Sequence, residues 1–454
     1  MIERSTQQRE QATTLVVGLG RTGLSCVRHL RGLGRRVAAV DSRVSPPELA
    51  AVSEEYPEVR VTLGGFLPEA FDDVGDIVVS PGVSLKEPAL ERALAERIPV
   101  CGDIELFARA VGTTPVVAIT GSNGKSTVTT LVADMLRADG RRVKVGGNLG
   151  LPALSLLDGE RPEVYVLELS SFQLETTDSL EPCVAALLNV SADHMDRYAD
   201  VEEYARTKER IFSGRGAMVL NRDDPRVAAM ARADRRVVFY TLETPEDDDF
   251  GLRHCDGREH LCAGKTPVIA SDALAVAGRH NVANALAAMA VASVLGVRHA
   301  SMARALEAFR GLAHRCQLIA EADGVRWYDD SKATNVGATV AAIRGLGGAR
   351  RLVLIAGGDA KGADFTALEA PLREHVRLAI LIGRDAARIA EVSRGVVETV
   401  RAEGMADAVG IARRAARPGD SVLLAPACAS FDMYASYEAR GDAFAAEVRR
   451  VLEA

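Results

Sequence analysis

The feature that most constrains this chain is a glycine-rich loop between an apolar β-type run at 115–120 and a helical pattern at 128–137. The loop consists of Gly121, Ser122, Asn123, Gly124, Lys125, Ser126 and Thr127. Successive backbone N–H groups of such a loop can surround phosphate oxygens, a lysine can neutralise the β- and γ-phosphates, and a hydroxyl can hold Mg²⁺. The general P-loop has a glycine where Ile119 stands, so Gly121 must provide the bend. The sequence therefore predicts a nucleoside triphosphate site beside a parallel sheet.

Strand-like and helix-like segments alternate along the rest of the chain. Apolar β-type runs stand at 13–17, 36–40, 76–80, 164–169, 184–190, 217–221, 236–241, 325–328, 351–356, 378–382 and 421–425. Helical patterns cover 24–33, 89–96, 281–295 and 301–309. Strands separated by helices predict right-handed βαβ units and parallel sheets, and therefore an α/β fold.

We expect three consecutive domains, each a mostly parallel sheet with helices. They are a Rossmann-like N-terminal domain (1–102), a central P-loop domain (103–311) and a Rossmann-like C-terminal domain (312–454). A length of 454 residues suits about three domains, and 48% apolar residues suffice for several buried cores.

Charge and composition exclude several classes of protein. The net charge of −7 gives no sign of a nucleic-acid binder. No apolar run approaches the ~18 residues of a membrane span, and the first ten residues lack the apolar core of a signal peptide. Seven cysteines without a CxxC pair suit a reducing compartment. We therefore expect a cytoplasmic protein without membrane insertion and without a nucleic-acid partner.

A second glycine-rich turn lies between the first β-type run and the first helical pattern. Gly18, Gly20 and Gly23 permit a tight turn and let the backbone approach a diphosphate at a helix N-terminus. Asp41 ends the next strand, where it can accept a hydrogen bond from a ribose hydroxyl or a base. NAD, another diphosphate nucleotide and a purely structural turn are all compatible with this pattern.

Two polar side chains follow later strands of the central domain. Glu168 ends one β-type run, and His194 comes shortly after another. Ligands of open parallel sheets bind outside the carboxyl ends of the strands, so both side chains are expected near the triphosphate. Glu168 is a plausible Mg²⁺ ligand. A surface carboxylate and a satisfied core histidine are the structural alternatives.

Lysine is scarce, since it supplies only seven of the 55 lysine and arginine residues. Lys208 lies on the apolar face of a helical pattern at 201–212, where an unpaired ammonium is costly. A snorkelling side chain or an ion pair would explain this position. The functional alternative is a partly desolvated amine with a lowered pKa, which could act as a nucleophile.

One group of side chains raises the question of a zinc site. Its members are His254, Cys255, His260 and Cys262. Their spacing matches no common structural zinc site, and the Asp256-Gly257 pair predicts a β-hairpin turn instead. We expect a hairpin in 250–275 and no metal.

Three polar clusters follow strands of the C-terminal domain, at 329–335, 357–361 and 428–432. Because these strands are expected to be parallel, the clusters should line one crevice. Lys332 and Lys361 belong to them, so four of the seven lysines lie in candidate sites.

These motifs, in this order, resemble the Mur ligase family over essentially the entire length of the chain. They lie at 18–25, 80–83, 102–107, 118–127, 146–154, 166–175, 188–198, 278–288, 313–315, 329–335, 357–365 and 426–434. Within the family, the resemblance is greatest to the members that add D-glutamate. It also implies that the N-terminal domain holds the UDP of a substrate and not NAD.

The resemblance implies a role for each matching residue. The UDP-linked substrate would be bound by Arg21, Thr22, Asp41, Ser42, Arg43, Ser80, Gly82, Asn148, Ser170 and His194. ATP would be bound by the loop 121–127 and by Asn281, Asn284, Arg315, Asp330 and Lys332. D-Glutamate would be bound by Thr334, Lys361, Ser430 and Tyr437. The catalytic group would be Lys125, Glu168, His194 and Lys208. Two Mg²⁺ ions would be held by Ser126, Glu168, His194 and a carbamate formed on Lys208.

The implied activity is that of an ATP-dependent ligase of peptidoglycan precursor synthesis. It would form an amide between UDP-N-acetylmuramoyl-L-alanine and D-glutamate through an acyl phosphate, with small-molecule partners only and as a monomer. Another Mur-type ligase or a folylpolyglutamate synthase-like ligase is the alternative within this class. An NAD-dependent oxidoreductase and a non-catalytic ATP-driven switch are the alternatives outside it.

Overall fold

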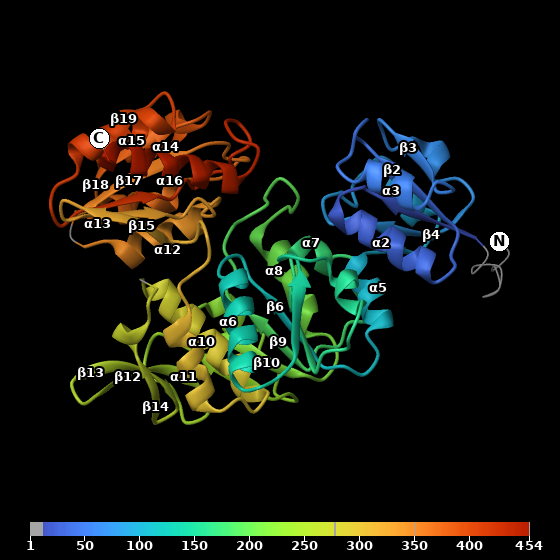
Figure 1. Ribbon diagram of the computed structural model, residues 1–454, viewed down its shortest axis with the longest axis horizontal. Helices are drawn as coiled ribbons and strands as arrows, with labels where there is room; N and C mark the ends of the chain where they lie inside the picture. The colour runs from blue at the N-terminus through green and yellow to red at the C-terminus, as the bar shows by residue number, and fades with distance from the viewer. Residues whose placement is uncertain (1–11, 277, 349, 454) are drawn as a thin grey trace.

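The computed structural model describes residues 12–276, 278–348 and 350–453. The chain forms three separate sheets (Figure 1). The first sheet (blue) and the third (orange to red) lie on opposite sides of the central unit (cyan to yellow) in this view. No helix within these ranges is long and apolar enough to cross a membrane.

The first sheet has five parallel strands in the order β3-β2-β1-β4-β5. Its strands are β1 (Thr13–Val17), β2 (Val37–Asp41), β3 (Arg60–Leu63), β4 (Val74–Val79) and β5 (Val100–Cys101). Its helices are α2 (Arg21–Gly32), α3 (Leu49–Glu55), η1 (Pro68–Ala70) and α4 (Pro88–Ala95). The strand order reverses between β1 and β4, which opens a crevice at their carboxyl ends.

The central sheet has nine strands in the order β14-β13-β12-β11-β10-β9-β6-β8-β7. Its strands are β6 (Val116–Thr120), β7 (Val143–Gly147), β8 (Val164–Glu168), β9 (Val184–Leu187), β10 (Ala217–Asn221), β11 (Val237–Tyr240), β12 (Phe250–Cys255), β13 (Arg258–Ala263) and β14 (Thr266–Ala270). The last three strands pair antiparallel with one another, and the others pair parallel.

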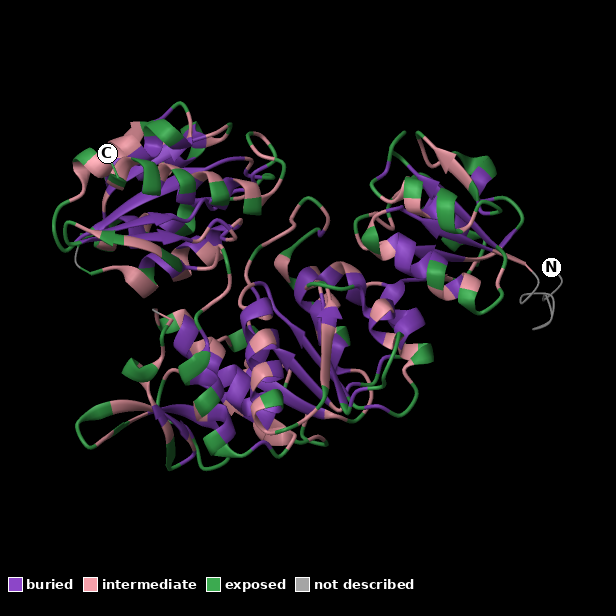
Figure 2. Cartoon of the chain, in the orientation of Figure 1, coloured by how far each residue is buried: buried purple, intermediate pink, exposed green. Residues whose placement is uncertain are grey.

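The helices of the central unit cover both faces of this sheet. They are α5 (Asp103–Ala110), α6 (Lys125–Ala138), η2 (Ala153–Leu157), α7 (Ser171–Leu174), α8 (Val201–Glu209), η3 (Arg210–Phe212), α9 (Pro225–Ala228), η4 (Ser271–Ala273), α10 (Arg279–Val294) and α11 (His299–Ala308). Residues 285–292 of α10 are buried on every side, and α10 packs against α6 (Figure 2). An apolar helix of this kind is typical of a protein interior.

The third sheet has six strands in the order β15-β16-β20-β17-β18-β19, and its edge strand β15 pairs antiparallel. Its strands are β15 (Gln317–Ala322), β16 (Val325–Asp329), β17 (Leu352–Gly357), β18 (Val376–Ile382), β19 (Glu398–Arg401) and β20 (Ser421–Leu424). Its helices are α12 (Val336–Leu346), η5 (Thr366–Leu368), α13 (Glu369–His375), α14 (Ala386–Ser393), α15 (Met405–Ala415) and α16 (Tyr437–Glu453).

The α/β class with mostly parallel sheets is confirmed, and each predicted strand forms with small shifts at its ends. The sequence did not reveal β3, β5, β7, β15 and β19, and each of these lies at the edge of its sheet. Edge strands are partly solvated, so they lack the continuous apolar run of a buried strand. Helices α2 and α6 begin three residues before their predicted starts, because their first turns are polar.

Candidate active site

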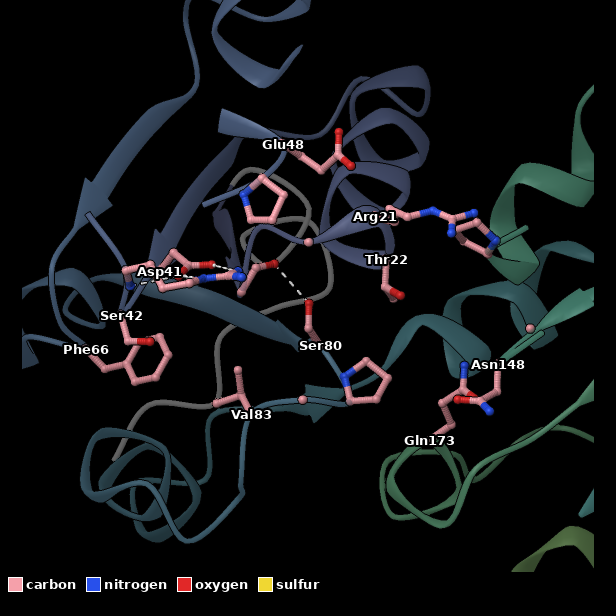
Figure 3. Close-up of a pocket in the computed structure, with 18 of the residues that line it drawn as sticks. Arg21, Thr22, Asp41, Ser42, Glu48, Phe66, Ser80, Val83, Asn148 and Gln173 are labelled. Carbon is pink, nitrogen blue, oxygen red and sulfur yellow. Dashed lines mark hydrogen bonds and ion pairs between the residues drawn. The ribbon is translucent and has the colours of Figure 1, made fainter. Parts of the chain in front are cut away.

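A large cavity of about 700 Å³ lies at the carboxyl ends of β1 and β4, between the first sheet and the central unit (Figure 3). We call it the N-terminal cavity. Predicted substrate-binding residues in its wall are Arg21, Thr22, Asp41, Ser42, Arg43, Ser80, Gly82 and Asn148. The other two members of that predicted set, Ser170 and His194, line a different cavity described below.

The glycines of the first turn are required by close approach of the backbone. Gly18 has φ +94°, and a Cβ there would lie 2.9 Å from the Cβ of Ser80. A Cβ on Gly23 would lie 1.9 Å from the Gly18 carbonyl oxygen. The Ser80 hydroxyl donates a hydrogen bond of 2.9 Å to the same oxygen. The turn is therefore tied to the loop after β4, and the N-terminus of α2 faces the cavity.

Asp41 is already engaged by its own domain. Its carboxylate accepts hydrogen bonds from the Leu19 amide at 2.7 Å and from the amide and guanidinium of Arg43 at 2.7–2.9 Å. Burial raises the pKa of Asp41, but these hydrogen bonds and the Arg43 charge outweigh it and bring the value to about 2. This carboxylate therefore holds the turn and Arg43 in place, and it also lies in the wall of the N-terminal cavity.

The P-loop adopts the geometry that its glycines predict. Gly124 has φ +83°, and a Cβ there would lie 2.4 Å from Oδ1 of Asn284 on α10. The Lys125 ammonium donates to the Gly121 and Ser122 carbonyls at 2.8 and 3.0 Å. Burial lowers the pKa of Lys125. The lysine thus closes over the loop whose amides would surround phosphate oxygens.

A second cavity, of about 330 Å³, runs from the P-loop toward α10 and α12, and we call it the P-loop cavity. Predicted ATP-binding residues in its wall are Asn123, Gly124, Thr127, Asn281, Asn284, Arg315, Asp330 and Lys332. Burial raises the pKa of Asp330 to about 7 and lowers the pKa of Lys332 to about 8. The cavity therefore joins polar groups of the central unit to those of the C-terminal domain.

A chain of hydrogen bonds connects the P-loop to neighbouring strand ends. The Ser126 hydroxyl donates to Glu168 at 2.5 Å, and Asn148 donates to the other carboxylate oxygen at 2.6 Å. Arg315 of the C-terminal domain donates to the Ser126 hydroxyl at 2.7 Å. Glu168 lies at the end of β8 and is 2% exposed. Two hard oxygen donors, a hydroxyl and a carboxylate, thus lie side by side at the P-loop.

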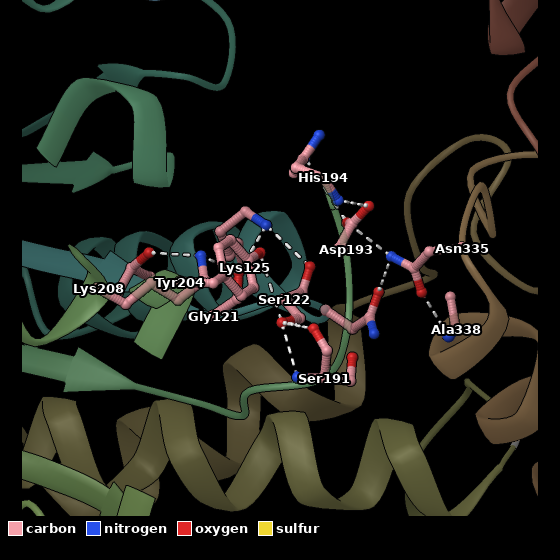
Figure 4. A network of polar contacts seen from close by, with 12 residues as sticks. Gly121, Ser122, Lys125, Ser191, Asp193, His194, Tyr204, Lys208, Asn335 and Ala338 are labelled. Carbon is pink, nitrogen blue, oxygen red and sulfur yellow. Dashed lines mark hydrogen bonds and ion pairs between the residues drawn. The ribbon is translucent and has the colours of Figure 1, made fainter. Parts of the chain in front are cut away.

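Lys208 is buried on the inner face of α8, with 1% exposure. Its ammonium donates to the Gly121 carbonyl at 3.0 Å and to the Thr120 hydroxyl at 3.4 Å, and it lies 4.5 Å from the centre of the Tyr204 ring (Figure 4). It forms no ion pair within the described part of the chain. Burial, followed by the Lys125 charge, lowers its pKa well below the ordinary value. Snorkelling and ion pairing are therefore both wrong as explanations of this lysine.

His194 lies in the loop after β9, with φ +58°. Its ring meets the Phe172 ring edge-on, with the ring centres 4.6 Å apart. Burial lowers the pKa of His194 despite the nearby Asp193 carboxylate. Asp193 accepts a hydrogen bond of 2.9 Å from Asn335 of the C-terminal domain (Figure 4). The two domains therefore meet beside His194.

A third cavity, of about 290 Å³, lies between these groups, and we call it the central chamber. The central unit contributes Ser122, Asn123, Gly124, Lys125, Ser126, Asn148, Glu168, Ser170, His194 and Lys208. The C-terminal domain contributes Arg315, Lys332, Thr334, Lys361, Ser430 and Tyr437. The four predicted catalytic residues and the four predicted amino-acid-binding residues therefore share one chamber. The Lys332 ammonium lies 3.9 Å from the centre of the Tyr437 ring, which orients both side chains.

Some chamber residues were missed in the sequence. They are Phe172, Asp193 and Tyr204, whereas Asn335 and Phe431 belong to the clusters that were expected to line one crevice. Asp193 precedes His194 and Tyr204 lies one helical turn before Lys208, so proximity to a predicted residue was the available signal. Ser170 lines the chamber, and its hydroxyl also caps α7 by accepting from the Gln173 amide at 3.2 Å.

The donor set suits Mg²⁺ better than a transition metal. Across residues 12–276, 278–348 and 350–453, no three His, Cys, Asp or Glu side chains lie close enough to form a metal site by themselves. Mg²⁺ typically takes one or two protein oxygens together with phosphate oxygens and water, which is what Ser126 and Glu168 can offer. The residues His254, Cys255, His260 and Cys262 lie in the predicted hairpin, which β12 and β13 form.

Comparison with known protein families covers all three parts of the chain. A Mur ligase MurD-like N-terminal domain matches residues 12–102, a Mur ligase middle domain matches 119–292, and a Mur ligase glutamate ligase domain matches 314–428.

Two curated proteins are similar over nearly their whole length. The UDP-N-acetylmuramoylalanine–D-glutamate ligase of Nitrosococcus oceani is 50% identical over 452 residues, which is 100% of both chains. The enzyme of the same name from Methylococcus capsulatus is 50% identical over 439 residues, covering 97% of this chain and 95% of its own.

Solved structures share the fold at low sequence identity. The MurF ligase of Thermotoga maritima in complex with ADP has a TM-score of 0.61 at 17% identity and covers 98% of each chain. The UDP-N-acetylmuramate–alanine ligase MurC of the same organism has a TM-score of 0.59 at 17% identity, covering 97% of this chain and 100% of its own. These likenesses establish the three-part architecture.

Proposed function

The chain belongs to the Mur ligase family, and from this premise we propose that it joins UDP-N-acetylmuramoyl-L-alanine to D-glutamate at the expense of ATP. It is an ATP-dependent, Mg²⁺-requiring ligase of peptidoglycan synthesis. The observation that carries the proposal is the central chamber, where the P-loop lysine and Glu168 face Lys361 and Ser430 of another domain. Phosphoryl transfer and amide formation can therefore share one enclosed space.

The first step requires an anion to approach ATP. The substrate carboxylate attacks the γ-phosphorus of ATP, and the bond between that phosphorus and the β,γ-bridging oxygen breaks. ADP is released, and the phosphorylated carboxylate is an acyl phosphate. Lys125 and the amides of the loop 121–127 stabilise the charge on the transferring phosphoryl group. Arg315 adds a positive charge from the C-terminal domain, because its guanidinium already reaches Ser126.

The second step joins the two substrates. The D-glutamate amine attacks the acyl carbonyl carbon and inorganic phosphate leaves. Lys361 and Ser430 bind the amino-acid carboxylates, with Thr334 and Tyr437 beside them. The acyl phosphate is prone to hydrolysis, so contacts such as Asn335 with Asp193 serve to close the chamber against water.

In this proposal the UDP group of UDP-N-acetylmuramoyl-L-alanine occupies the N-terminal cavity. That cavity is large enough for a nucleotide sugar, and Asn148 lies in the walls of both the N-terminal cavity and the central chamber. A substrate held by Arg21, Ser42 and Ser80 can therefore extend past Asn148 toward the P-loop. The adenine of ATP would lie in the P-loop cavity against Asn281 and Asn284.

We further propose that two Mg²⁺ ions bind in the chamber and that Lys208 carries a carbamate. Mg²⁺ supplies neutralisation of phosphate charge. Ser126, Glu168 and His194 are the side chains that would hold the ions. Burial favours the neutral amine of Lys208, which can attack CO₂ to form an N–C bond and release a proton. The resulting carbamate would provide an anionic oxygen that lysine itself cannot.

We also propose that the protein acts as a monomer in the cytoplasm. ATP and nucleotide-linked sugars are cytoplasmic substrates. The domain limits 1–102, 103–311 and 312–454 belong to this proposal, and they fall between β5 and α5 and between α11 and β15.

Release of phosphate and ADP tests the activity directly. Purified protein is mixed with ATP, Mg²⁺ and UDP-N-acetylmuramoyl-L-alanine, and then with each of a panel of D- and L-amino acids. Turnover should require D-glutamate. Turnover with L-alanine and UDP-N-acetylmuramate, with a diamino acid, or with a folate and L-glutamate would favour another ligase of this class.

A further inference from the structure

The loop after β9 contains an arginine whose side chain crosses from the central unit to the first domain. Arg197 donates hydrogen bonds to the Pro81 carbonyl at 3.0 Å and to the Val83 carbonyl at 3.3 Å. Both acceptors lie in the loop after β4, which lines the N-terminal cavity. Lys86 returns a hydrogen bond of 2.9 Å to the Arg197 carbonyl. The two loops are therefore joined at both the side chain and the backbone of one residue.

The same guanidinium packs against the ring of Phe172, a residue in the wall of the central chamber. Its central carbon lies 4.1 Å from the centre of the Phe172 ring. Phe172 lines the chamber, and its ring meets the His194 ring at 4.6 Å. Two further ring contacts, between Phe172 and Tyr198 and between His194 and Tyr204, extend the cluster to α8. A displacement of the Phe172 ring would therefore change the position of the His194 ring.

The Arg197 side chain is nearly buried, so each of its polar groups needs a partner within the protein. The Arg197 side chain is 11% exposed and pairs with Glu175, which also accepts a hydrogen bond of 2.5 Å from the Tyr198 hydroxyl. A guanidinium presents its donors in a rigid plane and stacks on an aromatic face, whereas an ammonium cannot satisfy three acceptors and a ring together. The residue type is thus matched to four simultaneous contacts.

We propose that Arg197 is a positioning residue that holds Phe172, and through it His194, in register with the nucleotide-binding loop 80–83. A nucleotide that orders this loop would then also steady the chamber wall in which His194 lies. The role rests on the proposed ligase function, and nothing in it requires Arg197 to touch a substrate. Misplacement of a reacting group by about 1 Å can lower a rate by about 100-fold, which sets the scale of the expected effect.

The test compares Arg197→Lys with a matched control, Arg226→Lys. Arg226 is 51% exposed, lies in the same unit and forms an ion pair with Glu202 at 2.7 Å. Steady-state phosphate release is measured with each substrate varied in turn. For Arg197→Lys we expect kcat/KM for UDP-N-acetylmuramoyl-L-alanine to fall by about 100-fold, through both kcat and KM, while the KM for ATP changes less than about twofold. The control should behave as the wild type.

A double-mutant cycle separates positioning from a general structural role. Arg197→Lys and Phe172→Leu are combined, and kcat is compared with that of each single variant. If Arg197 acts through Phe172, the double variant should be no slower than the slower single variant. Additive losses, or equal rises in all three KM values, would overturn the proposal.

A gentler variant covers the case in which Arg197→Lys does not fold. Lys86→Met removes only the hydrogen bond to the Arg197 carbonyl. It should lower kcat/KM for UDP-N-acetylmuramoyl-L-alanine by about twofold to fivefold and leave the KM for ATP nearly unchanged. If Lys86→Met left kcat/KM for UDP-N-acetylmuramoyl-L-alanine unchanged, or changed all three KM values equally, the positioning role of Arg197 would be refuted. Failure of the proposed function is a separate result, because the wild type itself would release no phosphate with these substrates.

Discussion

Replacement of Lys208 by methionine should change stability and activity in opposite directions. The Lys208 ammonium donates to the Gly121 carbonyl and to the Thr120 hydroxyl. Neither group is left without a partner by the substitution, because Lys125 also donates to Gly121 at 2.8 Å and Thr120 donates to the Leu169 carbonyl at 2.7 Å. The two lost hydrogen bonds therefore cost about 0.5–1.5 kcal/mol each.

The stability gained by removing the buried amine should exceed the stability lost with its hydrogen bonds. Methionine keeps the apolar stem of Lys208 inside the core and removes a buried amine that has no acidic partner within the described ranges. After the lost contacts are counted, replacing buried ionic groups by apolar side chains of similar volume is commonly neutral or stabilises a protein by about 1–4 kcal/mol. We expect a net increase of about 1–3 kcal/mol in the free energy of unfolding. For a unit of about 200 residues this raises Tm by about 2–10 °C.

Thermal unfolding in Mg²⁺-free, CO₂-free buffer measures the stability, and phosphate release measures the activity. Turnover of Lys208→Met should fall by at least ~10³-fold, since neither an amine nor a carbamate remains. Lys265→Met is the control, because Lys265 is 76% exposed beside Asp247, and it should change stability by less than about 0.5 kcal/mol. A Lys208→Met protein that is less stable than the wild type by more than ~1 kcal/mol, or that keeps its turnover, would refute this reasoning.

Four further results are expected. Lys125→Ala should fold normally and lose at least ~10²-fold in kcat, and near-normal turnover would remove the P-loop lysine from the mechanism. UDP should protect the amides of 18–23 from hydrogen exchange and NAD should not; the reverse would favour the oxidoreductase alternative. Lys361→Ala should raise the KM for D-glutamate more than the KM for ATP, as steady-state kinetics would reveal. Burial raises the pKa of Asp103 to about 6, so its carboxyl keeps a proton in the folded state that the unfolded chain releases near pH 4. The stability it contributes is lost as pH rises from about 4 to 6, and Asp103→Asn should abolish that slope in denaturant titrations.

Local pattern was sufficient for the buried strands and the glycine turns. Apart from the hairpin strands β12 and β13, each predicted strand is flanked by other strands or covered by helices, so most of its residues are apolar. The five strands that were missed lie at sheet edges, where one side faces solvent and no such run is needed. Gly18 and Gly124 were recognisable because a tight turn at a phosphate site demands glycine, and the structure places both at positive φ.

The chemistry of single residues depended more on their neighbours in space. The apolar face of its helix was enough to place Lys208 on the side that meets the core, because helical periodicity records that side, but a snorkelling side chain remained an alternative. The sequence did not reveal the hydrogen-bond partner of Lys208, because that partner is the Gly121 carbonyl, 87 residues away in the chain. Asp41 was recognisable as a strand-end carboxylate, yet only the folded turn shows that Leu19 and Arg43 occupy it.

The sequence by itself determined the three-sheet α/β architecture, the P-loop and the position of many site residues at the ends of strands. Only the tertiary structure decided which loops share a cavity, since that depends on how three separately folded sheets pack. It brought Lys361 to the chamber of Lys125, and it placed Arg197 between Phe172 in the wall of that chamber and the loop at Pro81. Periodicity reports burial along one element at a time, and a contact between domains leaves no such period in the chain.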